Sequence, residues 1–261
     1  MPIVIKYGGS VTTELELRRR LAQQIASLAR TDRNPVVVHG GGPYIREALE
    51  QAGIVSSFVR GLRVTTAESL PVVEQCLTML NKRLSQEIGQ AVGLTGRDSS
   101  LLIARPLTEL GMVGEMHSVN TAVISRLLRL QLTPVIACLA ENLDSPHGEH
   151  PDYPDSLLNV NADSVAGAVA GALESPVVFL SDVPGVLEDP SNPESLISEL
   201  DEAEIREKIA SGVIAGGMIP KVEAALSALK AGASFAVIAD GRKPEELPLA
   251  MNGHSGSRVY A

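Results

Sequence analysis

Two glycine clusters near the N-terminus each end a short apolar run. Gly8 and Gly9 follow the run IVIKY at 3–7, and three glycines at 40–42 follow the run PVVVH at 35–39. Such runs are typical of buried strands, and glycine permits the tight turn from a strand into a helix. A glycine turn leaves backbone N–H groups uncovered, so it can bind a phosphate or a carboxylate at a helix N-terminus. The pair of turns therefore predicts an anion-binding edge.

The rest of the chain alternates apolar strand-like runs with helical patterns. Strands are predicted at 134–139, 177–180 and 235–239, and helices before Arg30, after Pro43, after Asn120, over 161–173, after Asp201 and over 219–230. This rhythm predicts an α/β fold, a three-layer αβα sandwich with a mostly parallel central sheet. Ligands of such sheets bind beyond the carboxyl ends of the strands, where both glycine clusters fall.

Three local patterns carry more specific expectations. Gly61 is expected in the turn of a short hairpin over 58–64, and the spacing of Thr65 and Glu68 predicts a capping box that opens the next long helix. The alternating runs LLIARPL and GMVGEMHSV predict a β-hairpin at an edge of the sheet. The segment 144–155, rich in Pro, Gly and acidic residues, predicts an exposed loop.

Composition excludes several classes of protein. The chain has 261 residues, 44% of them apolar, which allows one large domain or two lobes. A net charge of −9 without a basic run argues against nucleic acid as a partner. No apolar stretch approaches the length of a membrane span, and the first residues read as a strand rather than a signal peptide. Cys76 and Cys138 are expected to be reduced core cysteines of a cytoplasmic protein.

Two groups of polar residues near the predicted strand ends are candidates for binding an anion. Lys6 is costly to bury without an anionic partner; it binds a phosphate beside the glycine turn, or it reaches past the sheet end into water. Asn159 and Asn161 share a face if their segment is extended, and Asp163 then lies in the first turn of a helix. These three residues bind a polar substrate together with cations, or Asn161 and Asp163 simply cap the helix.

Two further cations have the same two interpretations. Lys221 lies in the first turn of a helix after Gly216 and Gly217, where the helix dipole disfavours a cation unless a phosphate is near; otherwise it is a surface lysine. Arg63 on the hairpin can clamp a carboxylate or remain exposed. The pattern HGEH, with its two histidines at 147 and 150, is typical of a solvated loop rather than a metal site. No metal ligand is predicted.

Taken together, the motifs resemble those of the amino acid kinase family. The matching segments are KYGGS, VVHGGGP, GLRVT, LNVNADSVA, FLSDVPGV and GGMIPK, in the order of the family and over nearly the whole chain. The resemblance implies the carbamate kinase-like fold. It also implies a substrate-binding and dimerisation lobe at 1–174 and an ATP-binding lobe at 175–261. GLRVT and NVNAD are most similar to members that phosphorylate the side-chain carboxylate of N-acetyl-L-glutamate with MgATP in arginine biosynthesis.

The resemblance assigns roles to single positions. It implies that Lys6 and Lys221 bind the phosphoryl group in transfer, that Asp163 holds both lysines, and that Gly9 donates a backbone N–H. The implied substrate-binding residues are Gly41, Gly42, Arg63, Asn159 and Asn161. The implied nucleotide-binding residues are Ser181, Asp182, Val183, Gly185, Val186, Leu187, Val213, Ile214, Ala215, Gly217 and Met218. A carboxylate is already ionised at neutral pH, so no histidine base is expected, and His39 is expected to support the glycine turn structurally.

Other functions stay open from the sequence. Related kinases act on an N-modified α-aminoadipate, one methylene longer, and a methylene gives only about 1–3 kcal/mol of discrimination. A non-catalytic sensor is the second alternative. A dinucleotide oxidoreductase is disfavoured, because no GxGxxG motif follows a strand. Relatives inhibited by arginine carry an extra N-terminal helix, and this sequence begins at its first strand. The resemblance therefore implies an arginine-insensitive homodimer.

Overall fold

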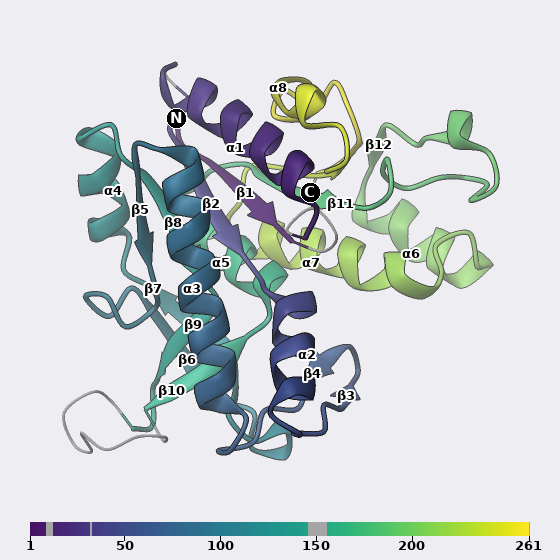
Figure 1. The fold of residues 1–261 in the computed structure, drawn as a ribbon. Coiled ribbons are helices and arrows are strands. Elements are labelled where there is room, and N and C mark those ends of the chain that lie inside the picture. The colour runs from purple at the N-terminus through teal and green to yellow at the C-terminus, as the bar shows by residue number, and fades with distance from the viewer. Residues whose placement is uncertain (9–12, 32, 146–155, 261) are drawn as a thin grey trace.

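A mostly parallel sheet of eight strands forms the middle of the molecule (Figure 1). The computed structural model describes residues 1–8, 13–31, 33–145 and 156–260. The strands lie in the order β12-β14-β13-β11-β1-β2-β8-β5, and only the pair β13–β14 is antiparallel. Their bounds are β1 (Ile3–Tyr7), β2 (Pro35–His39), β5 (Ala91–Leu94), β8 (Thr133–Ala137), β11 (Val177–Ser181), β12 (Glu199–Leu200), β13 (Ala236–Asp240) and β14 (Ser257–Val259). The predicted α/β class is confirmed.

Helices cover both faces of this sheet. Alternate residues of β1 point to opposite faces, so that Val4 packs in the core under α5 and α7 while Ile3 and Ile5 pack in the core under α1 and α3. The described helices are α1 (Leu15–Ala29), α2 (Gly42–Gln51), α3 (Leu70–Ile88), α4 (Thr121–Arg129), α5 (Ala162–Ala172), α6 (Glu202–Ser211), α7 (Ile219–Lys230) and α8 (Leu247–Ala250). Short 3-10 turns include η2 (Thr108–Leu110), η3 (Pro193–Ser195), η4 (Gly216–Met218) and η5 (Pro244–Glu246). The result is the expected three-layer sandwich.

A second, smaller sheet corrects one prediction. The two alternating runs do pair antiparallel, as β6 (Leu102–Pro106) and β7 (Val113–Val119), but not at an edge of the main sheet. They close a four-stranded barrel with β9 (Leu139–Asn142) and β10 (Leu157–Val160). The strand predicted at 134–139 is divided for the same reason, because β8 ends at Ala137 and the chain crosses at Cys138 into the barrel.

The start of α3 corrects another prediction. Thr65 and Glu68 do not form a capping box, and α3 begins at Leu70, two residues beyond Glu68. Thr66 and Ser69 instead bond each other, with the Thr66 N–H donating to Ser69 Oγ at 2.8 Å and the Ser69 N–H donating to Thr66 Oγ1 at 3.1 Å. Thr65 is fully buried and accepts a hydrogen bond from Asn159, so its hydroxyl is engaged elsewhere. The predicted hairpin is confirmed as β3 (Phe58–Val59) and β4 (Leu62–Arg63).

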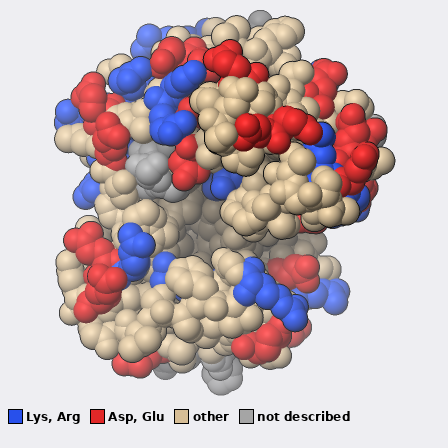
Figure 2. Space-filling model, turned by 90° about the vertical axis from the view of Figure 1, so that its right-hand side faces the viewer, with Lys and Arg blue, Asp and Glu red and all other residues tan. Residues whose placement is uncertain are grey.

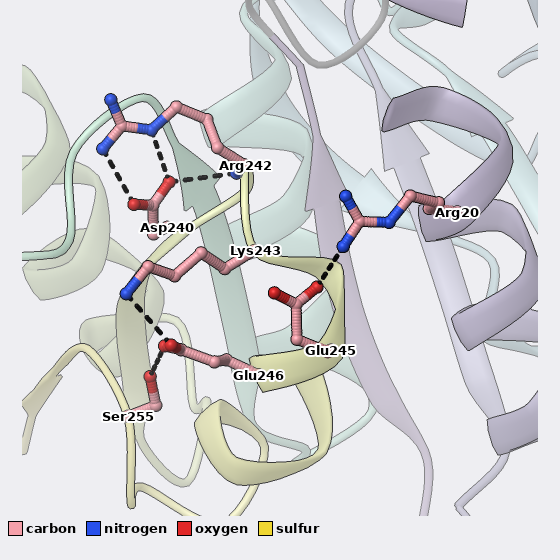
Figure 3. A network of polar contacts seen from close by, with 7 residues as sticks. All are labelled: Arg20, Asp240, Arg242, Lys243, Glu245, Glu246 and Ser255. Carbon is pink, nitrogen blue, oxygen red and sulfur yellow. Dashed lines mark hydrogen bonds and ion pairs between the residues drawn. The ribbon is translucent and has the colours of Figure 1, made fainter. Parts of the chain in front are cut away.

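A polar network ties the C-terminal region to α1 (Figure 3). Asp240 at the end of β13 accepts two hydrogen bonds from the guanidinium of Arg242, each at 2.8 Å. Arg20 on α1 pairs with Glu245 of η5 at 2.6 Å. Within the described part of the chain no helix is long and apolar enough to cross a bilayer. Most of the predicted loop at 144–155, including both histidines of HGEH, lies outside the described residues.

Candidate active site

Two cavities lie at the carboxyl ends of the parallel strands. The first, which we call the β1–β2 cavity, has a volume of about 240 Å³. The second, the β11 cavity, has a volume of about 380 Å³. A third hollow of about 470 Å³ between the hairpin and helices α5 and α7 shares Asn161 and Asp163 with the β1–β2 cavity. Figure 2 shows the face that bears α6 and the β3–β4 hairpin hollowed across its middle.

The β1–β2 cavity brings together most of the predicted substrate-side residues. Its polar lining comes from β1, the second glycine turn, the hairpin, β10 and the start of α5. The predicted residues that line it are Lys6, Gly41, Gly42, Arg63, Asn159, Asn161 and Asp163. Gly9 lies outside the described residues, so its predicted role has no structural description. Segments more than 150 positions apart in the chain therefore meet at one site.

An ion pair lies at the centre of this cavity. Lys6 Nζ at the end of β1 contacts Asp163 Oδ1 at 2.9 Å, and both side chains are about four-fifths covered, with 17% and 22% exposed. Asp163 lies in the first turn of α5, where the helix dipole favours a carboxylate. A largely covered lysine held by one carboxylate keeps N–H donors that can bind a further anion. The glycine at position 8 packs against this side chain, since an added Cβ would lie 3.0 Å from Lys6 Nζ.

The position of Asp163 depends on how α5 begins and packs. Asn161 caps the helix, because its Oδ1 accepts from the N–H groups of Asp163 at 2.8 Å and Ser164 at 3.1 Å. Asn161 also lines the cavity, so the capping role and the cavity position coexist. Further along α5, Gly167 and Gly171 allow close packing against α7 and the turn after it, where a side chain would collide with Ala228 or Ala231. The small residues of α5 thus fix the carboxylate beneath Lys6.

Arg63 is held at the mouth of the cavity by the hairpin. Its guanidinium lies over the ring of Phe58, 4.6 Å from the centroid. It donates to Ser56 Oγ and, at 3.2 Å, to the carbonyl oxygen of Gly42. Burial, and to a lesser extent the charge of Arg46, lowers the pKa of Arg63 from its ordinary value. The arginine is therefore oriented, but none of these three partners is an anion.

Asn159 and the glycine turn complete the polar lining. Asn159 Nδ2 donates to Thr65 Oγ1 at 3.0 Å, which orients the amide beside the cavity. The carbonyl of Gly41 accepts the first hydrogen bond of α2, from Ile45 at 2.8 Å. Among the described residues, the N–H groups of Gly41 and Gly42 have no hydrogen-bond acceptor. These two N–H groups therefore remain available at a helix N-terminus.

The β11 cavity gathers most of the predicted nucleotide residues. Nine of them line it: Asp182, Val183, Gly185, Val186, Leu187, Val213, Ala215, Gly217 and Met218. Ser181 and Ile214 do not line it. Ser181 is buried and donates to Asp182 at 3.2 Å, and Ile214 is 1% exposed in the core. The lining is mainly apolar side chains and glycine backbone, which suits the flat face of an aromatic base.

Lys221 lines the β11 cavity and not the β1–β2 cavity. It lies in the first turn of α7, as the sequence predicts, and its Nζ donates to the Gly217 carbonyl at 3.2 Å. Its neighbour Pro220 lines the third hollow together with Asp163. The two predicted lysines therefore line different cavities rather than share one.

Ser257 supports the β11 cavity and was not found from the sequence. Its hydroxyl accepts from the Val186 N–H at 2.8 Å and donates to the Ile197 carbonyl at 2.6 Å. It also lies against Gly185, whose φ of 152° and crowded surroundings exclude a side chain. β14 thus braces the loop after β11. In the sequence Ser257 is only a serine near the C-terminus, and nothing links it to the loop after β11 before the strand order is known.

Among the described residues, no histidine lines either cavity. His39 is completely buried beneath the glycine turn, and burial lowers its pKa to about 4, so it is neutral at pH 7. Cys138 is buried, and burial raises the pKa of its thiol. Within the described residues, no three His, Cys, Asp or Glu side chains lie close enough to hold a metal ion. The described lining of the two cavities therefore provides cations, N–H donors and the carboxylates of Asp163 and Asp182.

The comparisons with known proteins point to one family. The amino acid kinase family model matches residues 1–240. The chain is 49% identical over 258 residues to the acetylglutamate kinase of Deinococcus radiodurans, covering 98% of this chain and 99% of that protein. The crystal structure of smu.665 from Streptococcus mutans UA159 matches at 28% identity with a TM-score of 0.80, over 100% of this chain and 98% of that one.

A more distant structure shares the fold alone. Carbamate kinase from Giardia lamblia, in a structure bound to AMP-PNP, matches with a TM-score of 0.64 at 16% identity, over 99% of this chain and 98% of that one. The match of the family model, together with near full-length identity to a curated kinase, identifies the chain as a kinase that belongs to the amino acid kinase family.

Proposed function

We propose that this kinase transfers the γ-phosphoryl group of ATP to the side-chain carboxylate of N-acetyl-L-glutamate, in arginine biosynthesis. The observation that carries the proposal is the Lys6–Asp163 ion pair inside a cavity that also contains an arginine, an asparagine and a glycine turn. The 49% identical relative, named acetylglutamate kinase, supports the same reaction.

In this proposal the β1–β2 cavity holds the acyl amino acid. Arg63 binds the α-carboxylate with its planar fork, and Asn159 binds the amide end. The N–H groups of Gly41 and Gly42 donate to oxygens of the reacting carboxylate or of the phosphoryl group. Asn161 orients Asp163 through the start of α5.

The β11 cavity holds the nucleotide. Lys221 on one side and Lys6 on the other neutralise the charge that spreads over the equatorial oxygens of the phosphoryl group. Asp163 keeps Lys6 in place. The nucleophile is an ionised carboxylate, so the reaction needs alignment and charge neutralisation rather than proton removal.

Mg²⁺ in this scheme accompanies the ATP phosphates, because water molecules and phosphate oxygens supply most of its ligands. When bound it neutralises phosphate charge. Among the described residues, Asp182 is a carboxylate in the β11 cavity, but the cavity contains no cluster of protein ligands. This donor set fits a metal held by the nucleotide.

We also propose that the chain has the two lobes that the sequence predicts, one for the substrate and dimerisation and one for ATP. Residues 1–174 contain the β1–β2 cavity and residues 175–261 contain the β11 cavity, although the central sheet is continuous across this boundary through the pair β1–β11. A homodimer that arginine does not inhibit, and a cytoplasmic location, remain predictions. Light scattering tests the homodimer, and an assay with millimolar arginine tests the insensitivity to arginine.

The deciding experiment is ATP-dependent acyl-phosphate formation, trapped with hydroxylamine. N-acetyl-L-glutamate, L-glutamate and N-acetyl-α-aminoadipate are compared at equal concentrations. We expect clear preference for N-acetyl-L-glutamate. Preference for the longer acid would contradict the proposed substrate but would leave the proposed phosphoryl transfer to a carboxylate in place. No product from any of the three acids, with ATP still bound, would indicate a non-catalytic sensor.

A further inference from the structure

A chain of buried polar contacts lies directly beneath the second glycine turn. His39, the last residue of β2, is completely buried, and its Nδ1 lies 3.1 Å from the carbonyl oxygen of Gly40. Its Nε2 lies 3.0 Å from Nδ2 of Asn81, a residue of α3 that is 1% exposed. Neither side chain lines the β1–β2 cavity or the β11 cavity, so the proposed reaction does not use them directly.

The surroundings of Asn81 determine which nitrogen of His39 carries the proton. Asn81 Nδ2 also lies 2.8 Å from the carbonyl oxygen of Val135 and 3.3 Å from that of Leu94. Both are acceptors, so the NH₂ group of Asn81 must be on this side, and it donates to Nε2 of His39. Since the buried ring is neutral, its one proton is on Nδ1 and is donated to the Gly40 carbonyl.

That hydrogen bond fixes the direction of the next N–H group. In a trans peptide the carbonyl of Gly40 and the N–H of Gly41 point in opposite directions. His39 holds the carbonyl toward the core, so the Gly41 N–H points away from the core, and Gly41 lines the β1–β2 cavity.

The remaining polar groups of the turn are also engaged. The Gly40 N–H donates to Tyr7, the His39 carbonyl accepts from the Cys138 thiol at 3.0 Å, and the Gly41 carbonyl accepts from Ile45. The turn therefore has little freedom to rotate this peptide.

We propose that the buried His39–Asn81 pair is a positioning device that aims the Gly41 N–H at the anion in the β1–β2 cavity. The inference rests on the proposed phosphoryl transfer only for the identity of that anion. A preorganised N–H donor acts most strongly where charge develops in the transition state, so the pair should influence kcat more than substrate affinity.

The test compares two isosteric replacements. Asn in His39→Asn can place an amide N–H near the former Nδ1, whereas Gln in His39→Gln can place one only near the former Nε2. We expect His39→Gln to lower kcat by about tenfold to a hundredfold with little change in either KM. His39→Asn should recover at least half of that loss on a logarithmic scale.

A second variant tests the proton itself. Asn81→Asp replaces the donor to Nε2 with an acceptor; at a pH high enough to keep the ring neutral beside the new carboxylate, this favours the other tautomer and removes the bond to Gly40. Ser85→Ala is the control, because its hydroxyl donates to the main-chain carbonyl of Asn81 and does not contact His39. We expect Asn81→Asp to behave like His39→Gln, and Ser85→Ala to lower stability without lowering kcat.

Nitrogen-15 NMR of the His39 ring gives a readout that does not depend on turnover. We expect a protonated Nδ1 and an unprotonated Nε2 in the wild type. A protonated Nε2, or equal kcat values for the Asn and Gln variants, would overturn the positioning role. If the wild type forms no acyl phosphate while the ring shows the Nδ1–H form, the proposed function fails and the arrangement of the turn stands.

Discussion

The two cavities are built in different ways, although both lie at strand ends of one sheet. In the β1–β2 cavity the charged and amide groups have protein partners: Lys6 pairs with Asp163, and Asn159 bonds Thr65. In the β11 cavity the lining is mainly backbone and apolar side chains, and Lys221 bonds the Gly217 carbonyl rather than a carboxylate. The difference indicates that the first cavity is preorganised for chemistry and the second is shaped mainly for binding.

The lysines should give the largest effects, because in the proposed mechanism each neutralises charge in the transition state. Lys6→Ala and Lys221→Ala should keep the fold but lower kcat by about three orders of magnitude or more. Steady-state kinetics with circular dichroism checks this. Lys230→Ala at the other end of α7 is the control, since that exposed lysine pairs with Glu202. If a Lys6→Ala or Lys221→Ala enzyme turned over at near the wild-type rate, its lysine would have no catalytic role.

The buried histidine predicts a pH effect on stability. The pKa of His39 is lowered from 6.5 to about 4, so the unfolded chain binds a proton that the folded chain does not. The contribution of His39 to the free energy of unfolding is constant above pH 6.5. It decreases as the pH falls toward 4, by about 3 kcal/mol in total. Urea unfolding between pH 8 and pH 4 measures it. His39→Asn should remove this component, and equal slopes for both proteins would contradict the assignment.

Arg63 tests whether the first cavity also selects its ligand. Arg63→Ala should raise the KM for the acyl amino acid by about tenfold to a hundredfold, since charge-assisted hydrogen bonds contribute roughly 1.5–3 kcal/mol. The KM for ATP and kcat should change much less. Arg63→Lys keeps the charge without the planar guanidinium, so its KM for the acyl amino acid should lie between those of the wild type and Arg63→Ala. An unchanged KM would remove Arg63 from the substrate site.

The smallest expected effect is at Ser257, which supports the loop beside the β11 cavity. Ser257→Ala leaves the Val186 N–H without its acceptor, so the loop after β11 should loosen. The KM for ATP should rise by about threefold to tenfold while kcat changes little. Ser255→Ala is the matched control, because Ser255 bonds Glu246 in the network of Figure 3. A fall in kcat without a change in KM would indicate that this cavity is also preorganised.

The sequence predicts the helices and strands of the molecule better than the side-chain contacts between them. β-branched runs and glycine turns locate β1 and β2, and the caps at Asn120, Asn161 and Asp201 mark helix starts that the structure confirms. Each of these signals is local, extending over a few residues. Propensity and pattern are therefore sufficient for them.

The missed features depend on partners far apart in the chain. His39 and Asn81 are 42 positions apart, and Val186 and Ser257 are 71 apart, so neither pair is visible before the strands are ordered. The barrel was missed for a similar reason, because an alternating hairpin gives no indication of which sheet it joins. The hydroxyl that could have capped α3, Thr65, is bound by Asn159 instead.

The division between the two cavities can be tested directly by calorimetric titration of two variants with two ligands. The ligands are N-acetyl-L-glutamate and a non-hydrolysable ATP analogue, and the variants are Arg63→Ala and Gly185→Val, which fills the crowded position after β11. We predict that Arg63→Ala weakens only the acyl amino acid and Gly185→Val weakens only the nucleotide. Loss of both ligands in a folded single variant, or the reverse pattern, would contradict the account.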